Sequence, residues 1–199
     1  MKALPKKLLP LALFGIAVTS LFSVRPAQAF TIRLKEVGSN VVANGSGAIN
    51  LTGLNFFNTG TTFANVIIAS GGFISLGGVG GNVTDYAGLS GPTNFGSGGE
   101  FDTTTGSGDN VAINGLLGGL AVPQGYVSGA ALSGSATWNN ATFASLGVTP
   151  GTYVWTWGTG LPNQNFTLVI GTVPDGGSTV SLLGCALLGL AALPRKLSC

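Results

Sequence analysis

Apolar residues recur in short runs between residues 30 and 172, and polar or glycine-rich positions separate them. In 31–37 and again in 166–170 apolar and polar side chains alternate, which is typical of a strand with one buried face. Residues 63–69 form a compact apolar run, as in a buried strand. The pattern predicts an all-β fold, a single β-sandwich or jelly-roll-like domain.

The remaining pattern predicts further strands and the turns between them. Strands are expected at 41–42, 48–57, 73–76, 111–117, 126–132, 141–148 and 152–157. Asn44-Gly45 favours a hairpin turn, and Pro150-Gly151 favours a type II turn. Between residues 77 and 110 Gly, Ser, Thr and Asn dominate, which predicts a long, mobile surface loop.

Residues 1–29 have the three parts of a secretory signal peptide. A cluster of lysines precedes an apolar stretch at 8–22, and Ala27 and Ala29 occupy a small-x-small cleavage site. Signal peptidase would then release an exported chain that starts at Phe30. A retained helix is the alternative, but the stretch is short and is broken by Pro10.

A second apolar stretch ends the chain, where 19 residues separate Asp175 from Arg195. As a helix they would span about 28 Å, against a hydrocarbon core of roughly 30 Å. We therefore expect a C-terminal transmembrane helix at about 178–194. Arg195 and Lys196 would stay cytoplasmic by the positive-inside rule, which leaves the preceding domain outside. A buried core helix is the alternative.

The tail at 173–199 resembles the PEP-CTERM sorting signals of bacteria. The order is that of the family: a short signature at Val173, Pro174 and Asp175, an apolar run, and a basic end. The run TWNNATFASLGVTPGTYVWTWG resembles a segment common just before such tails. The resemblance implies an exosortase-like processing enzyme, a membrane protease or transpeptidase, in bacteria that make exopolysaccharide. The usual signature is Pro-Glu-Pro, from which this variant differs at Asp175 and Gly176.

Charge and cysteine content narrow the classes of function. Between Phe30 and Pro174 two cations, Arg33 and Lys35, stand against five anions, a net charge of −3. No basic surface for nucleic acid is therefore expected. The chain has no His, and neither of its two cysteines lies between residues 30 and 172. The commonest general base and any cysteine nucleophile are missing, so we expect no enzyme and no cofactor.

Two groups of residues could still carry a site. Tyr153, Trp155 and Trp157 alternate on one strand and project from one face. They either fill the core or form a glycan platform, and the small side chains of the opposite face favour the core. The acids of the Gly-rich region, Glu100, Asp102 and Asp109 with Asp85, could hold Ca²⁺ or act as a glycosidase pair. They lack the spacing of an EF-hand, so solvated charge is the preferred interpretation.

These observations favour an exported, surface-sorted, non-enzymatic structural protein of the bacterial envelope or exopolysaccharide (biofilm) matrix. The chain would be anchored in the inner membrane by its C-terminal helix and reach the cell surface or extracellular matrix after processing. Its expected partners are signal peptidase, the exosortase-like enzyme, the membrane and extracellular polysaccharide, but no nucleic acid. A carbohydrate-binding module that uses the aromatic strand is the alternative function.

Overall fold

The computed structural model describes residues 28–62 and 64–171. Outside these residues lie the predicted signal helix, formed by the apolar stretch at 8–22, and the cleavage residue Ala27. The whole sorting tail, with its predicted transmembrane helix, also lies outside them. Within them the only helix is a single 3-10 turn, Ala69–Gly71, so the described part contains no helix long and apolar enough to cross a bilayer. Everything else is strand, turn or loop, and the predicted all-β class is confirmed.

In residues 28–62 and 64–171, thirteen strands form two sheets. The six-stranded sheet has the order β12-β13-β1-β2-β11-β8. Its strands are β1 Thr31–Val37, β2 Asn40–Ala48, β8 Gly106–Gly108, β11 Ala131–Trp138, β12 Gly151–Thr156 and β13 Asn165–Ile170. The seven-stranded sheet has the order β3-β6-β10-β9-β5-β4-β7. Its strands are β3 Asn55–Thr61, β4 Asn65–Ile68, β5 Phe73–Leu76, β6 Asn82–Ala87, β7 Glu100–Thr103, β9 Val111–Asn114 and β10 Gly119–Pro123.

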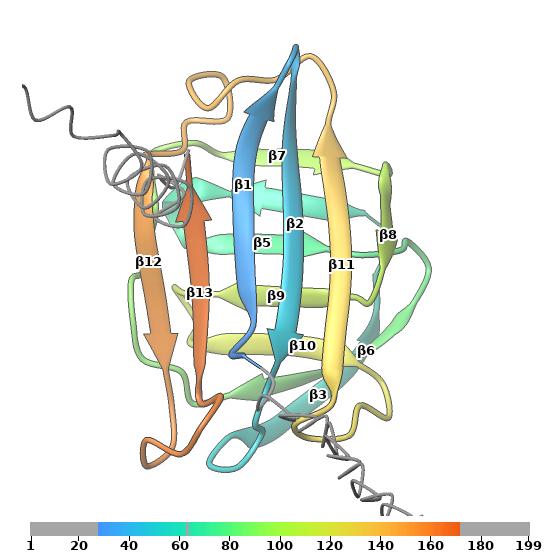
Figure 1. Ribbon diagram of the computed structural model, residues 1–199, viewed down its shortest axis with the longest axis vertical. Helices are drawn as coiled ribbons and strands as arrows, with labels where there is room; N and C mark the ends of the chain where they lie inside the picture. The colour runs from blue at the N-terminus through green and yellow to red at the C-terminus, as the bar shows by residue number, and fades with distance from the viewer. Residues whose placement is uncertain (1–27, 63, 172–199) are drawn as a thin grey trace, which may run out of the picture.

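The two sheets lie one behind the other, and the strands of one run across those of the other (Figure 1). Their facing sides supply the core. Ile32 and Leu34 of β1 are fully buried, as are Ile74 of β5 and Ile113 of β9. Burial of alternate residues explains why these segments read as strands in the sequence. The jelly-roll-like detail of the predicted fold stays a prediction.

The first and last strands lie side by side in the six-stranded sheet. β1 pairs with β13 in parallel, from Thr31 opposite Thr167 to Leu34 opposite Ile170. The backbone N–H of Gly171 still donates to the carbonyl of Leu34 at 3.0 Å. The segment that leads into the sorting tail therefore leaves directly from an inner strand of this sheet.

The predicted hairpin turn at Asn44-Gly45 is wrong, because β2 runs straight through both residues. Gly45 faces the core, where a Cβ would lie 2.7 Å from Cζ of the Phe30 ring. Any side chain at position 45 would collide with this ring, so glycine leaves the space that the ring occupies. The chain reverses instead at Gly38, whose φ of 61° lies in the left-handed region that favours glycine.

Residues 77–110 do not form the long mobile loop that their composition predicted. They contain β6, β7 and β8, and each of these pairs with a strand from elsewhere in the chain. The stretch between β6 and β7 is held by Phe95, which is 1% exposed and whose N–H donates to the carbonyl of Ala69. A buried ring and strand pairing thus fix a segment whose composition is polar and glycine-rich.

Four other predictions need correction. Residues 141–148 form turns rather than a strand, and the positive φ expected at Gly151 is at Gly147, so no type II turn forms at Pro150-Gly151. Residues 49–54 and 124–130 are loops, although strands were predicted at 48–57 and 126–132. The Tyr126 hydroxyl accepts a hydrogen bond from the N–H of Ile49 at 3.0 Å, and this bond ties the two loops together.

Candidate functional site

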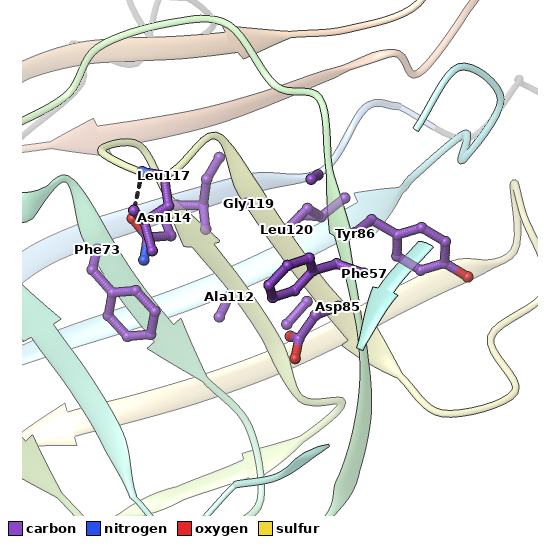
Figure 2. A pocket seen from close by; sticks show the side chains of 12 residues that line it. Phe57, Phe73, Asp85, Tyr86, Ala112, Asn114, Leu117, Gly119 and Leu120 are labelled. Carbon is purple, nitrogen blue, oxygen red and sulfur yellow. Dashed lines mark hydrogen bonds between the residues drawn. The ribbon is translucent and has the colours of Figure 1, made fainter. Parts of the chain in front are cut away.

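A groove of about 420 Å³ lies on the outer face of the seven-stranded sheet. Figure 2 shows the side chains that line it, which come from β3, β5, β6, β9 and β10 and from the turn after β9. Its volume is within the range of small-molecule sites, roughly 300–1,000 Å³. The strand register explains how these residues meet.

Two rows of side chains cross the outer face of this sheet. In one, Phe73 of β5 is opposite Asn114 of β9, which is opposite Gly119 of β10. In the other, Ala112 is opposite Ala121, and Ala121 is opposite Asp85 of β6. Neighbouring strands are about 4.8 Å apart, so from β5 to β6 the groove spans roughly 14 Å.

The groove has an apolar floor and aromatic walls. Ala112, Gly119 and Ala121 line its floor, where the small side chains leave the hollow. Phe73 stands at one end and Phe57 at the other (Figure 2). Phe57 is the extra residue of a β-bulge between β3 and β6, and it is 73% exposed. A bulge re-aims a side chain, and here it accompanies an exposed ring beside the groove.

Asp85 places a carboxyl group beside the Phe57 ring (Figure 2). Partial burial raises the pKa of this carboxyl above its ordinary value. Among residues 28–62 and 64–171, no hydrogen-bond donor or cation contacts the Asp85 carboxyl within bonding distance. It is therefore a free acceptor at one end of the groove.

Asn114 provides a polar group at the other end. Its Oδ1 accepts a hydrogen bond from the N–H of Leu117 at 3.0 Å, which shapes the turn after β9 (Figure 2). This bond orients the side-chain amide, and its Nδ2 donates to no acceptor in the described part of the chain. The groove thus combines a donor, an acceptor and two phenyl rings around an apolar floor.

The aromatic strand has a different role from this groove. Trp155 is fully buried and Trp157 is 5% exposed, with their indole N–H groups donating to the carbonyls of Pro92 at 2.8 Å and Asn50 at 2.7 Å. Tyr153 is half-buried and donates to the carbonyl of Thr149. These rings fill the core, so the glycan platform that the sequence allowed has no open surface on this strand.

The other acids are spread over several elements. Glu100 and Asp102 are exposed on β7, and Asp109 accepts a hydrogen bond from the N–H of Ser133 at 2.8 Å. In the described ranges, 28–62 and 64–171, no three His, Cys, Asp or Glu side chains gather in a way that could hold a metal ion. The structure therefore does not bring the predicted acid cluster together.

Sequence reasoning missed the groove entirely. The sequence pattern predicts a mobile loop around Asp85 and the end of a strand at Phe57, and it gives Phe73 and Asn114 no role. The alternation of side chains along β5 and β9 could have shown which residues of each strand share a face. The pairing of β6 with β10 and of β5 with β9 was not readable from the sequence.

The predicted signal junction lies partly inside the structure. Ala29 forms a parallel bridge with Ala48, whose N–H donates to the carbonyl of Gln28 at 2.7 Å. Phe30, the predicted first residue after cleavage, is fully buried. Ala27 and the sorting residues Val173, Pro174, Asp175, Arg195 and Lys196 lie outside the described residues.

Comparison with known proteins identifies the tail. Residues 172–197 match the family model described as VPDSG-CTERM motif. Gly176 stands where the motif's name has Ser. Neither the curated proteins nor the solved structures contain a match to the chain. Such a tail implies processing by an exosortase-type enzyme and indicates an exported, sorted protein. The chain carries a VPDSG-CTERM motif, a PEP-CTERM-like sorting tail, as the sequence predicted.

Proposed function

We propose that this chain is an exported, surface-sorted, non-enzymatic structural protein of the bacterial envelope or exopolysaccharide matrix. The observation that carries the proposal is the sorting tail at residues 172–197. Signal peptidase and an exosortase-like enzyme are its processing partners. A C-terminal helix holds the chain in the inner membrane until processing releases it to the cell surface or matrix.

A structural rather than catalytic role is supported by the chemistry of the exported region. No His is present, and no Cys lies between residues 30 and 172. Five strand spacings separate β6 from β7, so Asp85 and Asp102 lie about 24 Å apart. A glycosidase needs its two carboxyl groups within about 10 Å. On this proposal the domain is a β-sandwich scaffold.

Fractionation of cells that express the chain tests this proposal. We expect the full chain first in the inner membrane and then, processed, at the cell surface. The double variant Arg195→Gln, Lys196→Gln removes the basic end and should reduce retention at the inner membrane, because those charges fix the orientation of the helix. A full chain that stays in the cytoplasm, or a double variant sorted like the wild type, would contradict the proposal.

A further inference from the structure

The charges of the exported domain are divided between its two outer faces. Arg33 and Lys35 alternate with the buried Ile32 and Leu34, so both cations project from the outer face of the six-stranded sheet. They are the only cations in residues 28–171. The outer face of the seven-stranded sheet therefore carries no cation of its own in the described ranges.

Three of the five acids lie on the seven-stranded sheet. Glu100 is opposite Ile68, which is opposite Phe73, so Glu100 shares the outer face with the groove. Asp102 is two residues farther along β7 and projects from the same face. With Asp85 in the groove itself, this face is negative, and it complements a cationic ligand rather than an acidic one.

The groove chemistry defines that ligand further. Phe57, Phe73 and the alanine floor suit a saturated ring whose faces carry apolar C–H groups. A positive group at the edge of the ring would pair with the free Asp85 carboxyl and contact the face of Phe57, as cations do with aromatic rings. Oxygen atoms at the far edge of the ligand can accept a hydrogen bond from Nδ2 of Asn114.

We propose that this groove binds an amino sugar residue of a glycan, with the sugar ammonium on Asp85 and the ring between Phe57 and Phe73. The span of about 14 Å from β5 to β6 accommodates a short stretch of an oligosaccharide. A partly de-acetylated aminoglycan is the class of polymer that presents such residues. The inference goes beyond the proposed function, because it assigns a binding site to the exported domain.

Calorimetric titration of the full chain, held in nanodiscs of zwitterionic lipid near neutral pH, tests the site. The probes are oligomers of glucosamine, of N-acetylglucosamine and of glucose, all of the same length. We expect the glucosamine oligomer to bind about tenfold more tightly than the two uncharged oligomers, as a charge-assisted hydrogen bond in a half-exposed site provides.

Three variants locate the binding. Asp85→Asn keeps the size of the side chain and should remove the tenfold preference for the ammonium. Phe57→Ala should weaken the binding of glucosamine oligomers by a similar factor, and its melting temperature shows that the fold survives because Phe57 is exposed. Asp102→Asn is the matched control, since it removes an acid from the same face outside the groove, and it should change affinity by no more than about twofold.

Several outcomes would overturn the proposal: no binding of the glucosamine oligomer, equal binding of the N-acetylated oligomer, or an unchanged affinity in Asp85→Asn. Equal losses in Asp85→Asn and Asp102→Asn would do so too, because they indicate unspecific attraction of a polycation. The titration uses purified protein and does not depend on sorting. A sorting failure and a binding failure are therefore distinguishable.

Discussion

Replacing Trp155 with Ala removes the largest fully buried side chain of the domain. Its indole ring meets Phe166 edge to face, with ring centroids 6.1 Å apart, and its Nε1 donates to the carbonyl of Pro92 at 2.8 Å. The backbone borders the ring closely. A Cβ at Gly91 would lie 2.6 Å from Cδ1 of the indole, and one at Gly115 would lie 2.8 Å from Nε1.

The expected cost of Trp155→Ala is about 3–5 kcal/mol, the range for large aromatic residues in cores. We expect the upper part of that range, because the indole is fully buried and its removal leaves a large cavity in the core. The carbonyl of Pro92 also loses its donor. A domain of this size has roughly 5–15 kcal/mol of stability, so the variant is marginal.

Urea unfolding followed by far-UV circular dichroism measures this cost. A thermal melt gives a second measure. Because a loss of 1 kcal/mol lowers the melting temperature by about 2–4 °C, that temperature should fall by about 10 °C or more. Val154→Ala is the matched control on the same strand, where the side chain is 41% exposed and points away from the core. It should change the free energy of unfolding by less than about 0.5 kcal/mol.

A Trp155→Ala protein within about 1 kcal/mol of the wild type would refute this reasoning. It would mean that the ring is not part of a close-packed core, and the aromatic strand would again be a candidate glycan surface. Trp155→Phe gives an intermediate test, because it keeps an aromatic ring but leaves the Pro92 carbonyl without its donor. Its cost should fall between those of the other two variants.

Three further predictions follow from particular contacts. Gly45→Ala should destabilise the domain by about 1–3 kcal/mol, because the new Cβ would lie 2.7 Å from the Phe30 ring, and an unchanged urea midpoint would argue against that packing. The pKa of the Asp85 carboxyl is higher in the folded state than in the unfolded state, so its ionisation destabilises the fold. The free energy of unfolding therefore falls as the pH rises from 3.8 through the raised pKa. Asp85→Asn should therefore raise the melting temperature slightly at about pH 7, and the gain should vanish at about pH 3.5; a loss at pH 7 would contradict the sign. Finally, the folded precursor should resist signal peptidase, because the N–H of Ala48 holds the carbonyl of Gln28 next to the cleavage site. Precursor that is unfolded in urea and diluted just before the assay should be cleaved. Equal cleavage rates of the two samples would contradict this prediction.

The sequence predicted those strands whose burial alternates within the strand itself. β1 was predicted with the bounds that the structure has, and β13 was recognised from Phe166, Leu168 and Ile170, all of which are buried. This information is local, because a strand with one buried face shows it in its own residues. The sorting tail was predictable for a similar reason, since its order of segments is contiguous.

Long-range contacts decided the elements that were predicted wrongly. Asn44-Gly45 has the composition of a turn, but Gly45 is required by the ring of Phe30, which lies across the core face of β2. The region 77–110 has the composition of a loop, but its strands are stabilised by partners elsewhere in the chain. Local propensity is a weak guide where tertiary contacts override it.

The groove was beyond sequence reasoning because five strands build it. Phe57, Phe73 and Asp85 are brought together by the order β3-β6-β10-β9-β5, which does not follow the chain. The bulge beside Phe57 depends in turn on its register with β6. No periodicity within a single segment reports such an arrangement.

The central claim, that this chain is exported and sorted through its tail, is tested most directly by the masses of its two mature termini. Intact-mass and terminal-peptide mass spectrometry of the protein recovered from the cell surface would give both ends in one measurement. We predict an N-terminus at Phe30 and a C-terminus near Asp175, with the apolar segment removed. A surface-bound or cytoplasmic chain that still extends from Met1 to Cys199 would contradict the account.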